Sequence, residues 1–192
     1  MKVLAINGSP RRGGNTAAMI DAATDELRAA GIEVEVVSLA DHDVKPCTGC
    51  ERCAKQPWDC PIEDDALPLL RKMVEADGVL MGSPVYCGGV TAQLKALMDR
   101  SIVPYQAGEL KGKVAGAIAV GGGKHGGQEM TISQLYTYFL MMDMIIAPAE
   151  GGYYGAMGTG DGKGEVRQDE DGIASARALG RRMAQLLGRH GP

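Results

Sequence analysis

Four of the five cysteines in the chain fall within one short stretch, residues 47–60. Cys47, Cys50 and Cys53 follow one another at intervals of three residues, and Cys60 is followed by Pro61. If the protein is cytoplasmic, where thiols stay reduced, such a cluster predicts a metal site rather than a set of disulfides. Zinc sites usually present two separated C-x-x-C pairs, and this stretch does not.

The cysteine spacing is closer to the bacterial ferredoxin run C-x2-C-x2-C-x3-C-P, which holds an iron-sulfur cluster. A 4Fe-4S cube offers four iron corners for four thiolates, and a short loop can reach them all. We therefore predict Cys47, Cys50, Cys53 and Cys60 as the ligands of such a cluster. Zinc stays as an alternative because both metals accept soft thiolate ligands, and reduced cysteines without any metal are a third reading.

A second group of residues suited to chemistry is the run from Gly8 to Thr16, GSPRRGGNT. It closes an apolar stretch and opens a helical pattern, so backbone N–H groups and a helix N-terminus should point at one spot and bind a phosphate. Gly14 stands where the loop of nucleoside triphosphatases has its Lys, and the glycine spacing does not give the dinucleotide motif G-x-G-x-x-G. A single phosphomonoester fits this loop better. The alternative is an ordinary tight turn with a good N-cap.

Composition limits the classes of protein that the chain can represent. Its 192 residues, 20.1 kDa mass and 45% hydrophobic content predict one globular domain, residues 1–192, in which residues 40–61 form a cysteine-rich insertion. Lys and Arg number 20 against 24 Asp and Glu, so no basic field attracts nucleic acid. Residues 1–9 lack a signal pattern and no apolar stretch could span a bilayer, so we expect a cytoplasmic protein without a membrane partner.

The elements that position these groups follow from apolar runs and helical spacing. Strands are predicted at residues 3–6, 34–39, 78–82, 114–120 and 144–147, and helices begin near residues 15, 65, 91, 128 and 173. This alternation predicts an α/β fold: a flavodoxin-like, doubly wound, five-stranded parallel sheet of order 2-1-3-4-5, with helices on both faces. The cysteines lie in the loop after strand two. Gly-rich loops after strands one, three and four should meet at the switch point, where this strand order places flavin mononucleotide (FMN).

One segment does not fit the alternation. Residues 150–172 are Gly-rich, polar and without periodicity, and they are too long for a routine connection. We interpret them as either a functional flap or a partly disordered stretch.

Three stretches carry a resemblance to a known family: Gly8-Ser9-Pro10-Arg11 through Asn15-Thr16, then Ser83-Pro84-Val85-Tyr86, and residues 93–100, QLKALMDR. Together they resemble the flavodoxin-like NADPH-dependent FMN reductase superfamily, over most of the chain to about residue 147. Within that superfamily, the cysteine stretch resembles the iron-sulfur flavoproteins of anaerobes, whose compact cysteine motif distinguishes them.

The resemblance implies roles for particular residues around FMN. Its phosphate would be held by Ser9, Arg11, Asn15 and Thr16. The isoalloxazine ring would be lined by Pro84, Val85, Tyr86, Cys87 and Gly88, with Gly122 and Gly123 approaching its other side. We expect Cys87 to pack beside the ring rather than to act as a nucleophile. Family members are homo-oligomers in which a cluster and a flavin of neighbouring subunits come close, which implies a homodimer or homotetramer.

The function expected from these cofactors is electron transfer. FMN exchanges two electrons as a hydride or one at a time, whereas a cluster passes single electrons. We therefore expect an oxidoreductase that connects the 4Fe-4S cluster, FMN and an external carrier such as ferredoxin, with no catalytic side chain. One alternative is an NAD(P)H-dependent reductase of flavins or quinones without a cluster. The other is a non-enzymatic flavin-binding redox sensor.

Overall fold

The computed structural model of the chain describes residues 1–151 and 154–190. Its strands are β1 (Lys2–Asn7), β2 (Glu33–Ser38), β3 (Gly78–Pro84), β4 (Val114–Gly121), β5 (Ile145–Ile146) and β6 (Ala156–Thr159). Its α-helices are α1 (Asn15–Ala29), α2 (Arg52–Lys55), α3 (Ala66–Glu75), α4 (Ala92–Arg100), α5 (Ile102–Tyr105), α6 (Gln128–Met141) and α7 (Glu170–His190). Two 3-10 helices, η1 (Leu39–Asp41) and η2 (Glu165–Gln168), complete the described elements.

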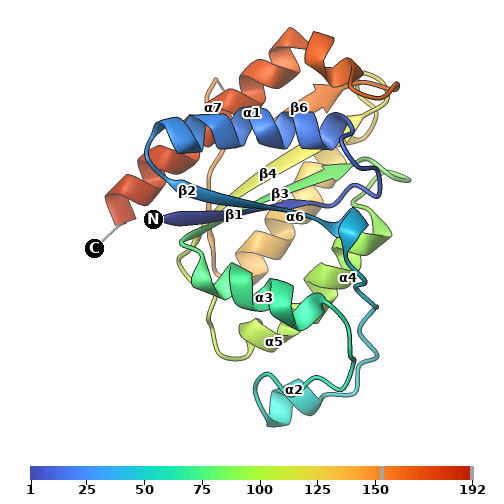
Figure 1. Cartoon of the computed structure of the whole chain (residues 1–192), viewed down its shortest axis with the longest axis vertical. Coiled ribbons are helices and arrows are strands. Elements are labelled where there is room, and N and C mark those ends of the chain that lie inside the picture. Colours follow the sequence, from blue (N-terminus) through green and yellow to red (C-terminus); the bar gives the residue numbers. More distant parts are fainter. Residues whose placement is uncertain (152–153, 191–192) are drawn as a thin grey trace.

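The sheet has the predicted order. Its strands run β2-β1-β3-β4-β5 and every adjacent pair is parallel, which confirms the flavodoxin-like fold with the cysteines after β2. Figure 1 shows the sheet between two layers of helices, with α1 and α7 on one face and α3, α4, α5 and α6 on the other.

The two hydrophobic cores follow from the alternation of side chains along β1. Val3 and Ala5 belong to the core beneath α1 and α7, whereas Leu4 and Ile6 belong to the core beneath α3, α4 and α6. All four side chains are at most 1% exposed. A central parallel strand must bury both faces, which explains why the run is continuously apolar rather than alternating.

The strand β6 was not predicted from the sequence. It pairs in parallel with the second half of β4, from Ile118 onward, whereas β5 pairs with the first half, Val114 and Ala115. Of its residues, AMGT, only Thr159 is β-branched and none is aromatic, and one is a glycine, so they do not form the pattern by which strands are recognised. Pairing with the buried strand β4 forms the strand in spite of this weak propensity.

The described part of residues 150–172 is therefore not a structureless flap. Besides β6 and η2, it is fastened to the first turn of α1 by the side chain of Asn15. The Asn15 Nδ2 donates to the carbonyl oxygens of Gly160 at 2.7 Å and Gly162 at 2.9 Å, and its Oδ1 accepts from the Val166 N–H at 3.3 Å. We call residues 160–166 the strap. Residues 152–153 of the predicted flap lie outside the described residues.

The helices α1 and α7 pack unusually closely because of one glycine. A Cβ atom on Gly180 of α7 would lie 2.2 Å from the carbonyl oxygen of Ala23 on α1. A side chain at this position would therefore push the two helices apart.

Among the described residues, no helix is both long and apolar enough to cross a membrane.

Candidate cofactor-binding sites

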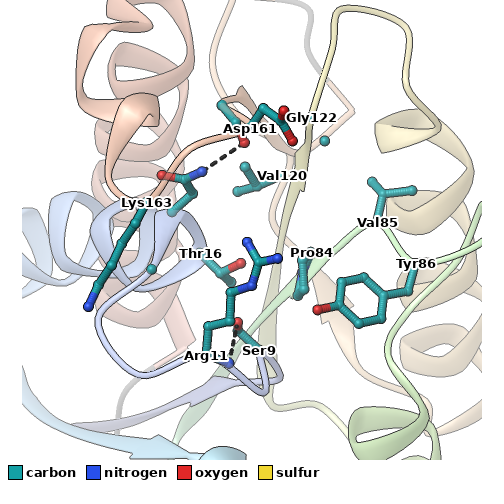
Figure 2. Close-up of a pocket in the computed structure, with 14 residues that line it drawn as sticks. Ser9, Arg11, Thr16, Pro84, Val85, Tyr86, Val120, Gly122, Asp161 and Lys163 are labelled. Atoms are coloured by element: carbon teal, nitrogen blue, oxygen red, sulfur yellow. Dashed lines mark hydrogen bonds between the residues drawn. The ribbon is translucent and has the colours of Figure 1, made fainter.

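A cavity of about 150 Å³ opens at the carboxyl ends of β1, β3 and β4 (Figure 2). This is the switch point of the strand order, where doubly wound folds bind their ligands. We call it the switch-point cavity. Its lining comes from the first loop and α1 (Ser9, Arg11, Gly14, Asn15, Thr16), from the second loop (Pro84, Val85, Tyr86), from β4 and the third loop (Val120, Gly121, Gly122), and from the strap (Gly160, Asp161, Lys163).

The first loop gives one side of the cavity the properties of an anion site. The helix α1 begins at Asn15, so its first N–H groups have no partner within the helix and face the loop. The Ser9 Oγ is buried and accepts a 3.1 Å hydrogen bond from the Arg11 N–H, which leaves its own hydrogen to donate. The guanidinium of Arg11 makes no ion pair within the described residues and extends over the cavity, and the Thr16 hydroxyl points into it (Figure 2).

Asn15 lies at the cavity wall, but its side chain does not have the predicted freedom to hold a phosphate. All of its amide hydrogen-bonding groups are engaged with the strap. Its backbone N–H, at the start of α1, stays available to an anion. The side chain therefore fastens the strap beside the first loop, which differs from the role that the resemblance implied.

The second loop reaches the cavity through its first half only. Pro84, Val85 and Tyr86 line the cavity, whereas Cys87 and Gly88 form the tip of a tight turn outside its lining. The turn is closed by two backbone hydrogen bonds between Tyr86 and Gly89, and both tip residues have positive φ. Cys87 is exposed on this turn.

The base of the second loop is well fixed. Thr91 is the N-cap of α4, and its hydroxyl oxygen accepts a hydrogen bond from the Leu94 N–H at 3.2 Å. Its hydroxyl also donates to the Gly8 carbonyl oxygen at 2.6 Å, which joins the second loop to the first.

The third loop reaches the cavity through one of its two predicted residues. Gly122 lines the cavity, whereas Gly123 does not. The carbonyl oxygen of Gly123 instead accepts a 2.9 Å hydrogen bond from the Gln128 side chain at the start of α6.

The strap adds residues that sequence reasoning missed. Asp161 and Lys163 lie on the wall opposite the second loop, and Asp161 stands beside Gly122 (Figure 2). Only the glycine content of residues 150–172 hinted at a close approach to a ligand. The sequence alone did not show that Asn15 would bring this segment to the cavity.

The four predicted ligand cysteines share a second cavity. Cys47, Cys50, Cys53 and Cys60 all line it, together with Arg100 from the end of α4. Positive φ values at Gly49 and Glu51 turn the chain back on itself between the cysteines. Within the described residues, no three His, Cys, Asp or Glu side chains converge closely enough to hold one metal ion.

A buried ion pair closes this second cavity. Arg100 Nη1 lies 2.6 Å from Asp64 Oδ2, and the two side chains are 1% and 0% exposed. Burial is the largest single influence, lowering the pKa of Arg100 and raising that of Asp64, but their mutual hydrogen bond, their opposite charges and their further hydrogen bonds together outweigh it. The pKa of Arg100 therefore lies above its ordinary value and that of Asp64 below, so both groups are charged at neutral pH.

Comparison with known proteins agrees with this geometry. The family model of NADPH-dependent FMN reductases matches residues 1–153. An iron-sulfur flavoprotein of Methanocaldococcus jannaschii is 46% identical to this chain over 190 residues, and the match covers 97% of each chain. An NAD(P)H dehydrogenase (quinone) of Nitrobacter winogradskyi is 30% identical over 195 residues, and that match covers 93% of this chain and 94% of the relative.

Among solved structures, the crystal structure of RosB with the bound intermediate 8-demethyl-8-formylriboflavin-5'-phosphate superposes with a TM-score of 0.80. The superposition covers 100% of this chain and 82% of that one, and at 21% identity it shows a shared fold. The chain therefore belongs to the iron-sulfur flavoproteins of the NADPH-dependent FMN reductase family.

Proposed function

We propose that this chain binds FMN in the switch-point cavity and a 4Fe-4S cluster on Cys47, Cys50, Cys53 and Cys60. In this proposal it transfers electrons between the cluster, FMN and an external carrier such as ferredoxin. The observation that carries the proposal is the presence of two separate cavities in one chain. One has an anion site at the switch point of the sheet, and the other is lined by all four clustered cysteines.

The switch-point cavity fits FMN by its chemistry. The start of α1, the Ser9 hydroxyl and the Arg11 guanidinium provide donors and positive charge for a terminal phosphate. Pro84, Val85 and Tyr86 provide a mostly apolar wall for a ring system. When bound, FMN supplies redox chemistry in one- or two-electron steps, and the residues of the chain bind it, orient it and limit its access to water.

The second cavity fits a cluster because it combines four thiols with a buried donor. The Nε of Arg100 is buried and has no hydrogen-bond partner within the described residues. A buried donor without a partner is costly, and a sulfide-bearing anionic group would satisfy it.

A second candidate function is an NAD(P)H-dependent quinone reductase. It is favoured by the 30% identity with the quinone dehydrogenase of Nitrobacter winogradskyi. In that case reducing equivalents would enter at FMN as a hydride, and the cluster would not be needed for the reaction.

The proposal includes a homodimer or homotetramer. An apolar groove of about 650 Å³ runs beside Cys47 between α4 and α6, with Met98, Ile102 and Met141 in its wall. Met141 is 54% exposed and its neighbour Leu140 is 67% exposed. An exposed patch of this kind supports an interface with another chain. Figure 1 also shows α2, the helix that contains Cys53, projecting beyond α3 and α5 and away from the start of α1, so transfer between subunits would shorten the path.

The experiment that separates the two functions is anaerobic stopped-flow reduction of the purified holoprotein. The proposal predicts that reduced ferredoxin bleaches the flavin rapidly, and that Cys50→Ser slows this reduction at least about tenfold. The control is reduction by NADPH. Rapid bleaching by NADPH that Cys50→Ser leaves unchanged, together with no reaction with ferredoxin, would favour the quinone reductase instead.

A further inference from the structure

Building on the proposed cluster, we propose that Arg100 is a positioning residue that holds the Cys60 thiolate and raises the reduction potential of the cluster. The Arg100 Nη2 donates to the Cys60 Sγ at 3.3 Å. The residue is the last of α4, so its backbone is fixed by a helix that packs on the sheet. The guanidinium therefore reaches the ligand from a rigid element and not from the cysteine loop itself.

The guanidinium also fastens the chain before the first cysteine. Its Nη1 donates to the Lys45 carbonyl oxygen at 3.1 Å, while the same nitrogen pairs with Asp64. The Asp64 carboxylate in turn accepts from the Lys45 N–H at 2.9 Å and from the Ala66 N–H at 3.0 Å. One ion pair thus joins the entry of the cysteine segment, its exit and the end of α4.

Burial makes this contact strong. The side chains of Arg100 and Asp64 are almost fully removed from water, so their charges are weakly screened. A charged donor to a thiolate sulfur stabilises negative charge there. Reduction of a cluster adds one negative charge, so the reduced form gains more from Arg100 than the oxidised form does. Hydrogen bonds to the sulfurs are one of the factors that set cluster potentials.

The Nε of Arg100, which has no hydrogen-bond partner in the part of the chain that the structure describes, adds to the effect. It belongs to the same guanidinium that lines the cysteine cavity, and it is buried with a hydrogen to donate. The Nη2 of this cation donates to the Cys60 Sγ and, at 3.5 Å, to the Ile62 carbonyl oxygen, Nη1 holds Asp64 and Lys45, and Nε keeps its hydrogen to donate.

The test is Arg100→Lys, which keeps the positive charge next to Asp64 but replaces the planar fork of donors by one ammonium. The matched control is Arg52→Lys, because Arg52 lies on α2 between two of the cysteines. It pairs with Asp59, yet its side chain is 53% exposed and donates to no cysteine. The measurement is the midpoint potential of the cluster in the holoprotein, from a redox titration followed by electron paramagnetic resonance, with iron and sulfide content.

We expect Arg100→Lys to keep its iron and to shift the reduction equilibrium about tenfold toward the oxidised cluster, which is 59 mV for one electron. Arg52→Lys should match the wild type. Equal potentials in Arg100→Lys and wild type, with full iron content in both, would overturn the inference and leave the proposed function intact. Wild-type protein without iron or sulfide would instead overturn the proposed function.

If Arg100→Lys does not fold, a double variant decides the question. Arg100→Met combined with Asp64→Asn removes both charges, so no unpaired ion is buried. The asparagine keeps an oxygen that can accept from the backbone. A lowered potential in this variant supports the inference, and a wild-type potential overturns it.

Discussion

Replacing Arg11 by alanine should weaken FMN binding without weakening the fold. The guanidinium is exposed and makes no ion pair within the described residues, and the Arg11 N–H still donates to the Ser9 Oγ in the variant. The whole effect should therefore appear in binding. A hydrogen bond to a charged group contributes about 1.5–3 kcal/mol, which corresponds to a Kd raised roughly 10- to 150-fold. Because Arg11 is exposed, we expect the lower part of this range.

The assay is quenching of flavin fluorescence when the apoprotein is titrated with FMN or with riboflavin, which lacks the phosphate. Arg11→Ala should weaken FMN binding and leave riboflavin binding unchanged. Arg12→Ala is the matched control, because the neighbouring Arg12 pairs with Asp41 and does not line the cavity. Equal FMN affinity in Arg11→Ala and wild type would refute the phosphate assignment, and so would an equal loss for both flavins.

Three further predictions test other parts of the structure. Cys50→Ser should lower the iron content while FMN is retained, whereas Cys87→Ser should change neither, because Cys87 lies outside both cavities. Metal and flavin analysis checks this, and loss of iron in Cys87→Ser would contradict the assignment of the four ligand cysteines. The pKa of Asp64 is lower in the folded chain than the value of about 3.9 in the unfolded chain, so its stabilisation is complete above about pH 4 and is lost as the pH falls through the folded value. Asp64→Asn in the apoprotein should lose about 3–5 kcal/mol at pH 7 in urea unfolding and show a smaller acid-induced loss, and an unchanged acid dependence would contradict the ion pair. Gly180→Ala should lower the free energy of unfolding by about 1–3 kcal/mol, because the added methyl group overpacks against α1. Gly188→Ala on the same helix is the control: its added Cβ meets no neighbouring element within 4 Å, so it should raise the free energy of unfolding slightly, and similar effects at both sites would refute the close packing.

The sheet could be predicted because its signals are local. The continuous apolar runs of β1, β3 and β4 and the glycines that follow them are readable from the sequence, and so is the N-cap of α4 at Thr91. The strand β6 could not be predicted, because its residues have weak strand propensity and acquire strand structure from pairing with β4.

The site was harder to predict wherever one side chain had two uses. An asparagine at a helix start suits a phosphate as well as a backbone carbonyl, and only the fold shows that Asn15 holds the strap. In the same way, the pairing of Arg100 with Asp64 joins residues 36 positions apart, and no local pattern encodes it. Cys87 and Gly88 follow Tyr86 directly, yet they form the tip of the turn and do not line the cavity.

The most direct test of the account is the cofactor content of the protein purified without oxygen. Absorption spectroscopy with analysis of flavin, iron, sulfide and zinc should give one FMN, four irons and four sulfides per chain, with no zinc. A preparation that contains zinc on the cysteines, or that stays colourless after reconstitution with FMN, iron and sulfide, would contradict it.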